Sequence, residues 1–345
     1  MILTRHNTAI FLINNGLLDI RSLMERSIAI RSHSQRNRGF SVTWANGQGY
    51  YVKQHRPDAG PWEKRSSVAH EAEVLQRLNE KPGLHDCVPT LRYYDAHRQA
   101  LVVDWLIAVR DVYKVAIGAV GPDLQVASHL GQTLAQLHRG LSDIACGDLP
   151  GQVPWVIRLD RLYPLAGEDQ SWGQARLVAL VQSQKECMAA LGALADTWPR
   201  MQLIHGDMKW QNCLLQGEHC VFIDWEMADR GDPLWDLAGL CQSWLKHWMD
   251  RQPRMASGSD AVAQAAQDFI PYQQALAQLW RSYRVAQERS AERLMSLCGA
   301  RLLQTLYEDL ADETNLSTTH IMLLQLARNL LVAPQQAAQQ WLEVA

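Results

Sequence analysis

The chain has 345 residues, of which 47% are hydrophobic and 20% are charged, and its formal net charge is −3. This composition is globular and excludes wholesale disorder, and the length suffices for two lobes or domains with cores of their own. The balanced charge gives no indication of a nucleic-acid partner.

The sequence also argues against a membrane or secreted protein and against a protein stabilised by zinc or disulfides. The longest apolar stretches, such as Ala9–Ile13 and Leu177–Val181, are far shorter than a membrane span, and the first residues lack the pattern of a secretory signal. The seven cysteines are odd in number and contain no C-x-x-C pair, which argues against a structural zinc site or a disulfide framework. We therefore expect a cytoplasmic protein without a membrane partner.

The predicted elements begin with a mostly helical segment over residues 1–27, after which the apolar period changes to that of β-strands. Five short strands are predicted: Ile28–Ser34, Phe40–Trp44, Tyr50–Gln54, Thr90–Asp95 and Ala100–Leu106. Asn46 and Gly47 predict a tight turn between the second and third strands. Pro61 predicts the start of a long helix that runs to about Asn79.

The rest of the chain is mostly helical, with amphipathic helices predicted over Leu124–Leu141 and over residues 171–197. A strand-rich island at residues 202–225 interrupts the helical pattern. The expected fold class is α+β, with a small β-rich lobe over residues 1–105 that holds one long helix. A larger, mostly helical lobe is expected over residues 106–345.

The island carries a spacing that is typical of phosphoryl transfer. His205 opens the pattern H-G-D-x4-N, which ends at Asn212, and Asp224 follows an apolar strand. Phosphoryl transfer needs a carboxylate beside the acceptor hydroxyl and two further oxygen ligands that hold Mg²⁺ on the ATP phosphates. The spacing predicts Asp207 as the base and Asn212 and Asp224 as metal ligands. Lys209 lies two residues after the base, where its ammonium group can reach the transferring phosphate.

The first lobe supplies a candidate for binding the α- and β-phosphates. Lys53 lies on the third predicted strand, and a lysine in this role pairs with a glutamate of the long helix. Glu71 and Glu73 are both candidates. We favour Glu71, because Leu75 and Leu78 then share its inward face at helical spacing.

These motifs together resemble the aminoglycoside phosphotransferase / choline kinase family, which has a bilobal, protein-kinase-like fold. The resemblance covers roughly residues 28–250 in motif order and depends most on H-G-D-x4-N, I-D-W-E and G-D-P-x-W-D-L-A. It implies ATP and Mg²⁺ as cofactors, with Asp207 as base and with Asn212 and Asp224 as metal ligands.

The resemblance implies two further roles. Asp236 would support the catalytic loop. Residues Val103–Leu106 would form the hinge between the lobes, and Val103 and Trp105 in it would contact adenine.

The turn that would cover the phosphates departs from the kinase pattern. Protein kinases have G-x-G-x-x-G at this place, whereas the segment Ser34–Gly39 contains one glycine. Backbone N–H groups, Ser34, Arg36 or Arg38 are the candidates for contacting phosphate here.

The sequence indicates the reaction but leaves the acceptor open. From residue 241 to the end there are ten acidic and nine basic residues. A site for a polycationic aminoglycoside should be clearly acidic, so this balance disfavours that acceptor. The expected function is an ATP- and Mg²⁺-dependent O-phosphotransferase that acts on the alcohol group of a small molecule or on peptide Ser/Thr.

Two alternatives stay open. The pattern R-N-R-G-F at residues 36–40, together with H-G-D-M-K-W-Q-N, is similar to a branch of the family that phosphorylates Ser or Thr of ribosomal, lanthipeptide-type precursor peptides. In that branch a partner lyase then eliminates the phosphate. The other alternative is a catalytically inactive, nucleotide-binding pseudokinase, which the presence of the base, both metal ligands and the lysine disfavours.

Overall fold

The computed structural model describes residues 2–21, 28–33, 37–56, 68–118, 121–162, 170–252, 259–284 and 290–343. The chain divides into two compact units. Unit 1 comprises Met1–Asp111 and Asn212–Ala228, and unit 2 comprises Val112–Gln211 and Asp229–Ala345. The division into lobes at residues 105 and 106 stays a prediction.

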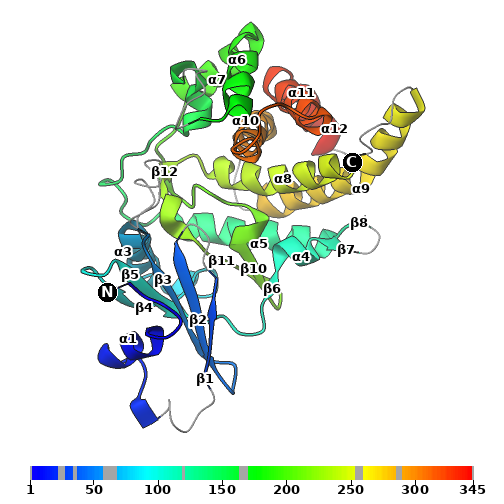
Figure 1. Ribbon diagram of the computed structural model, residues 1–345. Coiled ribbons are helices and arrows are strands. Elements are labelled where there is room, and N and C mark those ends of the chain that lie inside the picture. Colours follow the sequence, from blue (N-terminus) through cyan, green and yellow to red (C-terminus); the bar gives the residue numbers. More distant parts are fainter. Residues whose placement is uncertain are drawn as a thin grey trace. The chain divides into compact units, whose positions relative to one another are not determined.

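A five-stranded antiparallel sheet forms the base of unit 1 (Figure 1). Its strand order is β1-β2-β3-β5-β4. The strands are β1 (Ile28–Ser32), β2 (Arg38–Trp44), β3 (Gly49–Gln54), β4 (Leu91–Asp95) and β5 (Ala100–Asp104). The five predicted strands are therefore confirmed, with no end shifted by more than two residues.

The two faces of this sheet are covered by different helices. Alternate residues such as Val42 and Val52 lie on one face, where they form a core with Phe11 and Leu12 of α1 (Thr8–Asn14). Helix α3 (Val68–Asn79) packs against β4 and β5 and buries its apolar side chains. The described part of the predicted long helix is confirmed, and its predicted start at Pro61 lies outside the described residues.

A β-hairpin completes unit 1. Strand β10 (Cys213–Gln216) pairs with β11 (His219–Phe222) and with β6 (Arg110–Asp111). Gly217, at φ +62°, supplies the left-handed residue of the hairpin turn. A 3₁₀ turn at Trp210–Asn212 precedes the hairpin, and another at Trp225–Met227 follows it.

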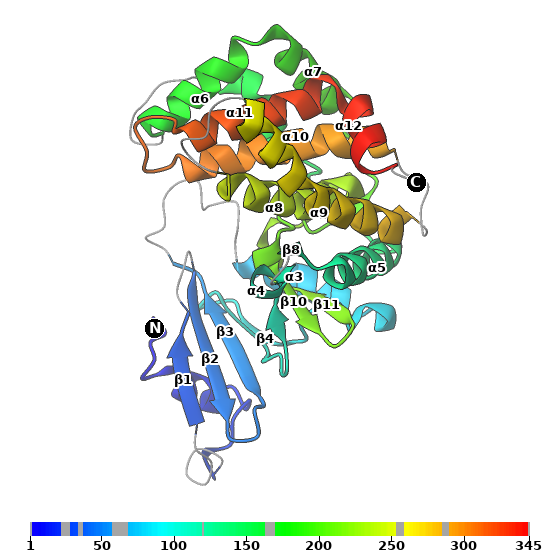
Figure 2. The same cartoon turned by 90° about the vertical axis from the view of Figure 1, so that its right-hand side faces the viewer.

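Unit 2 is mainly helical (Figure 2). Its helices include α5 (Leu124–Leu141), α8 (Pro233–Asp250), α9 (Ser259–Arg284), α10 (Ala291–Asp309), α11 (Thr318–Val332) and the short α12 (Pro334–Trp341). Helix α5 packs against α9, and α10 packs against both α8 and α11. Its short elements include α4 (Val112–Val115), β7 (Ile117–Gly118), β8 (Gly121–Pro122), a 3₁₀ helix at Trp155–Arg161, β9 (Gln202–Ile204) and β12 (Asp229–Gly231).

Two predictions about helices were wrong in detail. The single helix expected over residues 171–197 is two helices, α6 (Trp172–Gln182) and α7 (Lys185–Asp196), because Gln184 has an extended backbone that interrupts the helix. Within the described residues 2–21, helix covers Thr8–Asn14 (α1) and residues 20 and 21, which is less than expected, and residues 22–27 lie outside the described residues. The α+β class itself is confirmed, with the antiparallel sheet in unit 1 and the helices concentrated in unit 2. No helix in the described ranges has the length and apolar character needed to cross a membrane.

Candidate active site

Lys53 of β3 is the centre of a buried ion cluster in unit 1. Its Nζ donates to Glu71 at 2.7 Å, to Glu226 at 2.9 Å and to Asp224. The side chains of Lys53, Glu71 and Glu226 are 11%, 6% and 6% exposed, whereas that of Asp224 is 38% exposed. Glu73, the alternative partner, is on the surface and pairs with an arginine one turn along α3. The predicted pair of Lys53 with Glu71 is therefore confirmed.

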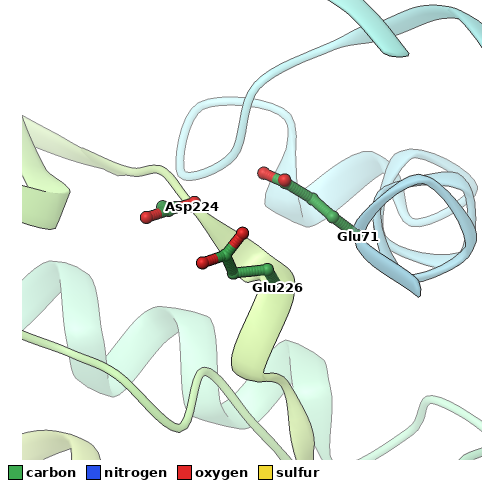
Figure 3. Close-up of side chains that lie close together, drawn as sticks. All are labelled: Glu71, Asp224 and Glu226. Carbon is green, nitrogen blue, oxygen red and sulfur yellow. The ribbon is translucent and has the colours of Figure 1, made fainter. Parts of the chain in front are cut away.

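Figure 3 shows how the three carboxylates converge, with Glu71 reaching from α3 toward the segment that follows β11. One ammonium group faces three carboxylates, so the cluster has an excess of negative charge. The pKa of Glu71 is raised to about 7, chiefly by burial and also by Asp224 and Glu226, against the lowering effect of Lys53. Burial alone would lower the pKa of Lys53, but the three carboxylates hold it well above its usual value.

The backbone around Asp224 is held in an uncommon conformation. Asp224 has φ 69° and ψ 61°, the left-handed region that a residue other than glycine seldom adopts. Two hydrogen bonds fix the neighbouring residues: Ile223 N–H donates to the Asn212 carbonyl at 2.9 Å, and Trp225 N–H donates to Glu71 Oε1 at 3.3 Å. The first bond extends the β10–β11 pairing, and it places Asn212 opposite the residue just before Asp224.

The donor set suits a hard divalent cation. Glu71, Asp224 and Glu226 each offer a carboxylate oxygen, and these oxygens lie within 4.8 Å of one another. Carboxylate and amide oxygens are the ligands that Mg²⁺ prefers. The predicted ligands Asn212 and Asp224 both lie in unit 1, and Asn212 is buried. Sequence reasoning missed Glu226, although I-D-W-E places it only two residues after Asp224.

An aromatic group adjoins the lysine on β3. Tyr51 lies two residues before Lys53 and therefore on the same face of the strand. The rings of Tyr51 and Trp105 are 6.5 Å apart at 30°, and those of His33 and Trp105 are 6.2 Å apart at 28°. Val103 pairs with Tyr51 in the neighbouring strand. The two predicted adenine contacts, Val103 and Trp105, thus lie beside a tyrosine that sequence reasoning missed.

The glycine-poor turn is described only at its end. Ser34 and Arg36, two of the predicted phosphate contacts, lie outside the described residues. Arg38 lies opposite Gln54, while Lys53 lies opposite the next residue of β2, so Arg38 is on the other face of the sheet from Lys53. Asn37 instead contacts the ion cluster, because its Nδ2 donates to Glu226 Oε2 at 3.0 Å.

Gly39 lies at the start of β2, opposite Lys53. A Cβ atom at this position would lie 2.2 Å from the Tyr51 hydroxyl oxygen. The one glycine of the turn is therefore required by the close approach of the Tyr51 ring.

The predicted catalytic loop lies in unit 2 and is held by α8. The carboxylate of Asp236 accepts hydrogen bonds from His205 N–H at 2.8 Å and from Gly206 N–H at 2.9 Å. Trp235 Nε1–H donates to the Gly206 carbonyl at 2.9 Å. Asp236 is fully buried and also contacts His138 at 3.1 Å. Burial alone would raise its pKa, but these contacts lower it. The arrangement fits the supporting role that the resemblance implied for Asp236.

Asp207 lies between two cations. Lys209 Nζ donates to its Oδ2 at 2.7 Å, and Arg301 Nη2 lies 3.5 Å from its Oδ1. Burial alone would raise the pKa of Asp207, but Lys209, Arg301 and His205 lower it below its usual value. Asp207 is therefore ionised at neutral pH. The pattern H-G-D-x-K locates Lys209, but no local signal in the sequence points to Arg301.

Solved structures with the same fold come from several phosphotransferases. A putative fructosamine-3-kinase from Thermobifida fusca is 21% identical, with a TM-score of 0.51 over 89% of this chain and 94% of its own. Choline kinase LicA from Streptococcus pneumoniae is 17% identical, with a TM-score of 0.53 over 95% and 99% of the two chains. Amicoumacin kinase hAmiN, in complex with AMP-PNP, Ca²⁺ and Ami, is 12% identical, with a TM-score of 0.54 over 95% and 94%. These likenesses show the shared kinase-like fold.

Comparison at the level of sequence gives the family. No curated protein matches the chain significantly. The model of the phosphotransferase enzyme family matches residues 27–285, which is most of the chain and includes Lys53, Asp207 and Asp224. The chain therefore belongs to the phosphotransferase enzyme family.

Proposed function

We propose that this protein is an ATP- and Mg²⁺-dependent phosphotransferase that moves the γ-phosphate to the hydroxyl group of a small molecule. The observation that carries the proposal is the ion cluster of the buried Lys53, Glu71 and Glu226 with the partly exposed Asp224. An ammonium group fixed beside carboxylate ligands is what phosphoryl transfer needs for binding phosphates and a divalent cation.

On the nucleotide side, Lys53 would bind the α- and β-phosphates while Glu71 holds its ammonium group in place. Asn212, Asp224 and Glu226 would hold Mg²⁺, which when bound neutralises the charge that develops on the phosphates. Tyr51, Val103 and Trp105 would contact adenine. The AMP-PNP and Ca²⁺ in the structurally similar amicoumacin kinase support a nucleotide and a divalent cation as ligands.

On the acceptor side, Asp207 would accept a hydrogen bond from the attacking hydroxyl and take its proton during transfer. Its lowered pKa makes it a weak base, so its main contribution is to orient the hydroxyl. Lys209 would contact the transferring phosphate. The new P–O bond forms to the acceptor oxygen as the bond between the γ-phosphorus and the β–γ bridging oxygen breaks.

A small-molecule acceptor has more support than a peptide. The similar structures include kinases named for choline, fructosamine and amicoumacin. Peptide Ser/Thr, with a partner lyase, stays a hypothesis that rests on the sequence pattern alone. We therefore test it in the same experiment.

The test is a mass-shift assay with Mg²⁺ and ATP against single candidate acceptors. The panel contains choline, a fructosamine, homoserine, an aminoglycoside and a Ser/Thr-containing peptide, and each is also incubated with Asp207→Asn. We expect a gain of one phosphate on a small alcohol with the wild-type protein. The variant should transfer roughly 10²- to 10⁴-fold more slowly and still bind ATP.

Each other outcome revises the proposal in a defined way. Phosphate on the peptide would replace the small-molecule acceptor with Ser/Thr. ATP binding without transfer to any member of a widened panel, with wild type and variant alike, would favour the inactive, nucleotide-binding protein. Equal transfer by wild type and Asp207→Asn would remove Asp207 from the mechanism.

A further inference from the structure

Arg301 of α10 is a buried arginine whose guanidinium group is fixed from several sides. It is 3% exposed, and its Nη2 donates to the Met208 carbonyl at 3.0 Å. Its Nη1 donates to Gln304 Oε1 at 3.0 Å, and its Cζ lies 5.0 Å from the centre of the Trp235 ring. The remaining contact is the ion pair with Asp207 Oδ1 at 3.5 Å.

The charge of Arg301 has a specific counter-charge. Its other contacts are a backbone carbonyl, an amide and an aromatic ring, which carry no net charge. Asp207 is the carboxylate with which Arg301 forms an ion pair in the described part of the chain. Because an unpaired charge is costly in a protein interior, the guanidinium group of Arg301 depends on the carboxylate of Asp207.

The helix α8 forms the other side of this arrangement. A Cβ atom at Gly239 would lie 2.0 Å from the Met208 carbonyl oxygen and 3.1 Å from Arg301 Nη2. Only a glycine lets α8 approach the catalytic loop this closely. Met208 is thereby held between α8 and the guanidinium group, directly after Asp207.

The two cations beside Asp207 differ in exposure and in the number of groups that hold them. The Lys209 side chain is 31% exposed and lies on the loop itself. The Arg301 side chain is 3% exposed and is anchored by a helix, a ring and a carbonyl. If Lys209 moves to a phosphate, Arg301 is the cation that stays with the carboxylate.

From these contacts we propose that Arg301 is a positioning residue for phosphoryl transfer, which fixes the Asp207 carboxylate and keeps it ionised while Lys209 engages the phosphate. The mechanistic part of this inference rests on the proposed function. The ion pair itself can be tested without any activity.

The first test is a double-variant cycle in thermal unfolding, with Asp207→Asn, Arg301→Met and both together. In the wild-type background, Asp207→Asn leaves the buried guanidinium group without its counter-charge. Asp207→Asn should therefore lower the unfolding temperature in the wild-type background. In the Arg301→Met background the same substitution should lower it less, or raise it. Additive changes would overturn the coupling, and this result does not depend on the acceptor or on catalysis.

The second test compares steady-state kinetics of Arg301→Met and Arg301→Lys over pH, once an acceptor is known. Lys209, Arg301 and His205 are the charged or titratable groups that act on Asp207. Arg301→Met should lower kcat roughly 10- to 100-fold, with the KM for ATP little changed. It should also move the acid limb of the kcat profile upward by about one pH unit. Arg301→Lys should keep the acid limb and lose part of kcat.

Arg293→Met is the matched control. Arg293 lies on the same helix, and it pairs with Asp232 at the start of α8 at 2.5 Å. Its loss should lower stability without moving the acid limb. An unchanged acid limb and kcat in Arg301→Met would overturn the positioning role. Failure of the wild type to transfer phosphate would count against the proposed function, while the unfolding cycle would still decide the pairing.

Discussion

The two groups of candidate site residues have opposite charge balance. In unit 1, one lysine faces three carboxylates, and the pKa of Glu71 is raised. In unit 2, one carboxylate faces Lys209 and Arg301, and the pKa of Asp207 is lowered. Burial acts in the same direction on both carboxyl groups, so the neighbours decide the difference. The first group is therefore suited to binding a further cation, and the second to keeping the Asp207 carboxylate ionised.

The largest expected effect comes from removing the cation of the first group. Lys53→Met leaves three carboxylates without their ammonium partner and removes the proposed phosphate ligand. We expect kcat/KM to fall roughly 10²- to 10³-fold. The unfolding temperature should also fall in EDTA and recover in part with Mg²⁺, as differential scanning fluorimetry can measure.

Arg77→Met is a control for that experiment. Arg77 pairs with the exposed Glu73 on α3, and such a surface pair is worth about 0.3–0.5 kcal/mol. If Mg²⁺ changed the unfolding temperature of Lys53→Met no more than that of Arg77→Met, the three carboxylates of the cluster would not form a cation site.

The next effect concerns pH. The pKa of Glu71 rises from 4.5 to about 7 on folding. A raised folded-state pKa gives stability that is present below pH 4.5 and is lost as pH rises through 7. The metal-free protein should therefore lose up to about 3 kcal/mol of unfolding free energy across this window. Urea unfolding in EDTA at several pH values measures the slope, and Glu71→Gln should flatten it.

The opposite sign is expected for the second group. The folded-state pKa of Asp207 is lowered, so its contribution is present at neutral pH and is lost as pH falls through the folded-state value. Glu71→Gln should leave this acid-side loss in place. If Glu71→Gln instead changed the loss of unfolding free energy at acid pH and left the loss between pH 4.5 and 7 in place, the contrast between the two groups would be wrong.

The smallest expected effect is at the glycine of the turn. Gly39→Ala places a Cβ within 2.2 Å of the Tyr51 hydroxyl, so the ring must shift from its present position beside Trp105. We expect ATP affinity, measured by calorimetry, to fall about fivefold, which is about 1 kcal/mol. Tyr51→Phe in the same chain removes the clashing oxygen and should restore part of the affinity. No recovery would show that the tyrosine hydroxyl is not the cause.

The sequence predicted those parts of the site that depend on short spacing. The strand period located Lys53, and helical spacing selected Glu71 over Glu73, because each depends on neighbours within a few residues. Arg301 could not be found in this way, since it lies 94 residues from Asp207 in the chain and reaches it only through the packing of α10 on α8.

The misses in the fold have a similar origin. The break between α6 and α7 depends on the extended backbone of one residue, Gln184, and neither a proline nor a glycine marks this break in the sequence. The face of Arg38 depends on the register of β2 against β3, which a one-residue shift reverses. Element type was predictable from periodicity, whereas register and long-range packing were not.

The three-way contact of Lys53 has a further consequence for the order of ligand binding. In the ligand-free protein the lysine acts as a resident counter-ion, so a divalent cation at Asp224 and Glu226 must compete with it. An anionic phosphate that draws Lys53 toward itself frees those carboxylates for the cation. Nucleotide and metal should therefore each raise the affinity of the other by the same factor. The site would then respond to the metal–nucleotide complex as a single ligand, and weakly to either component alone.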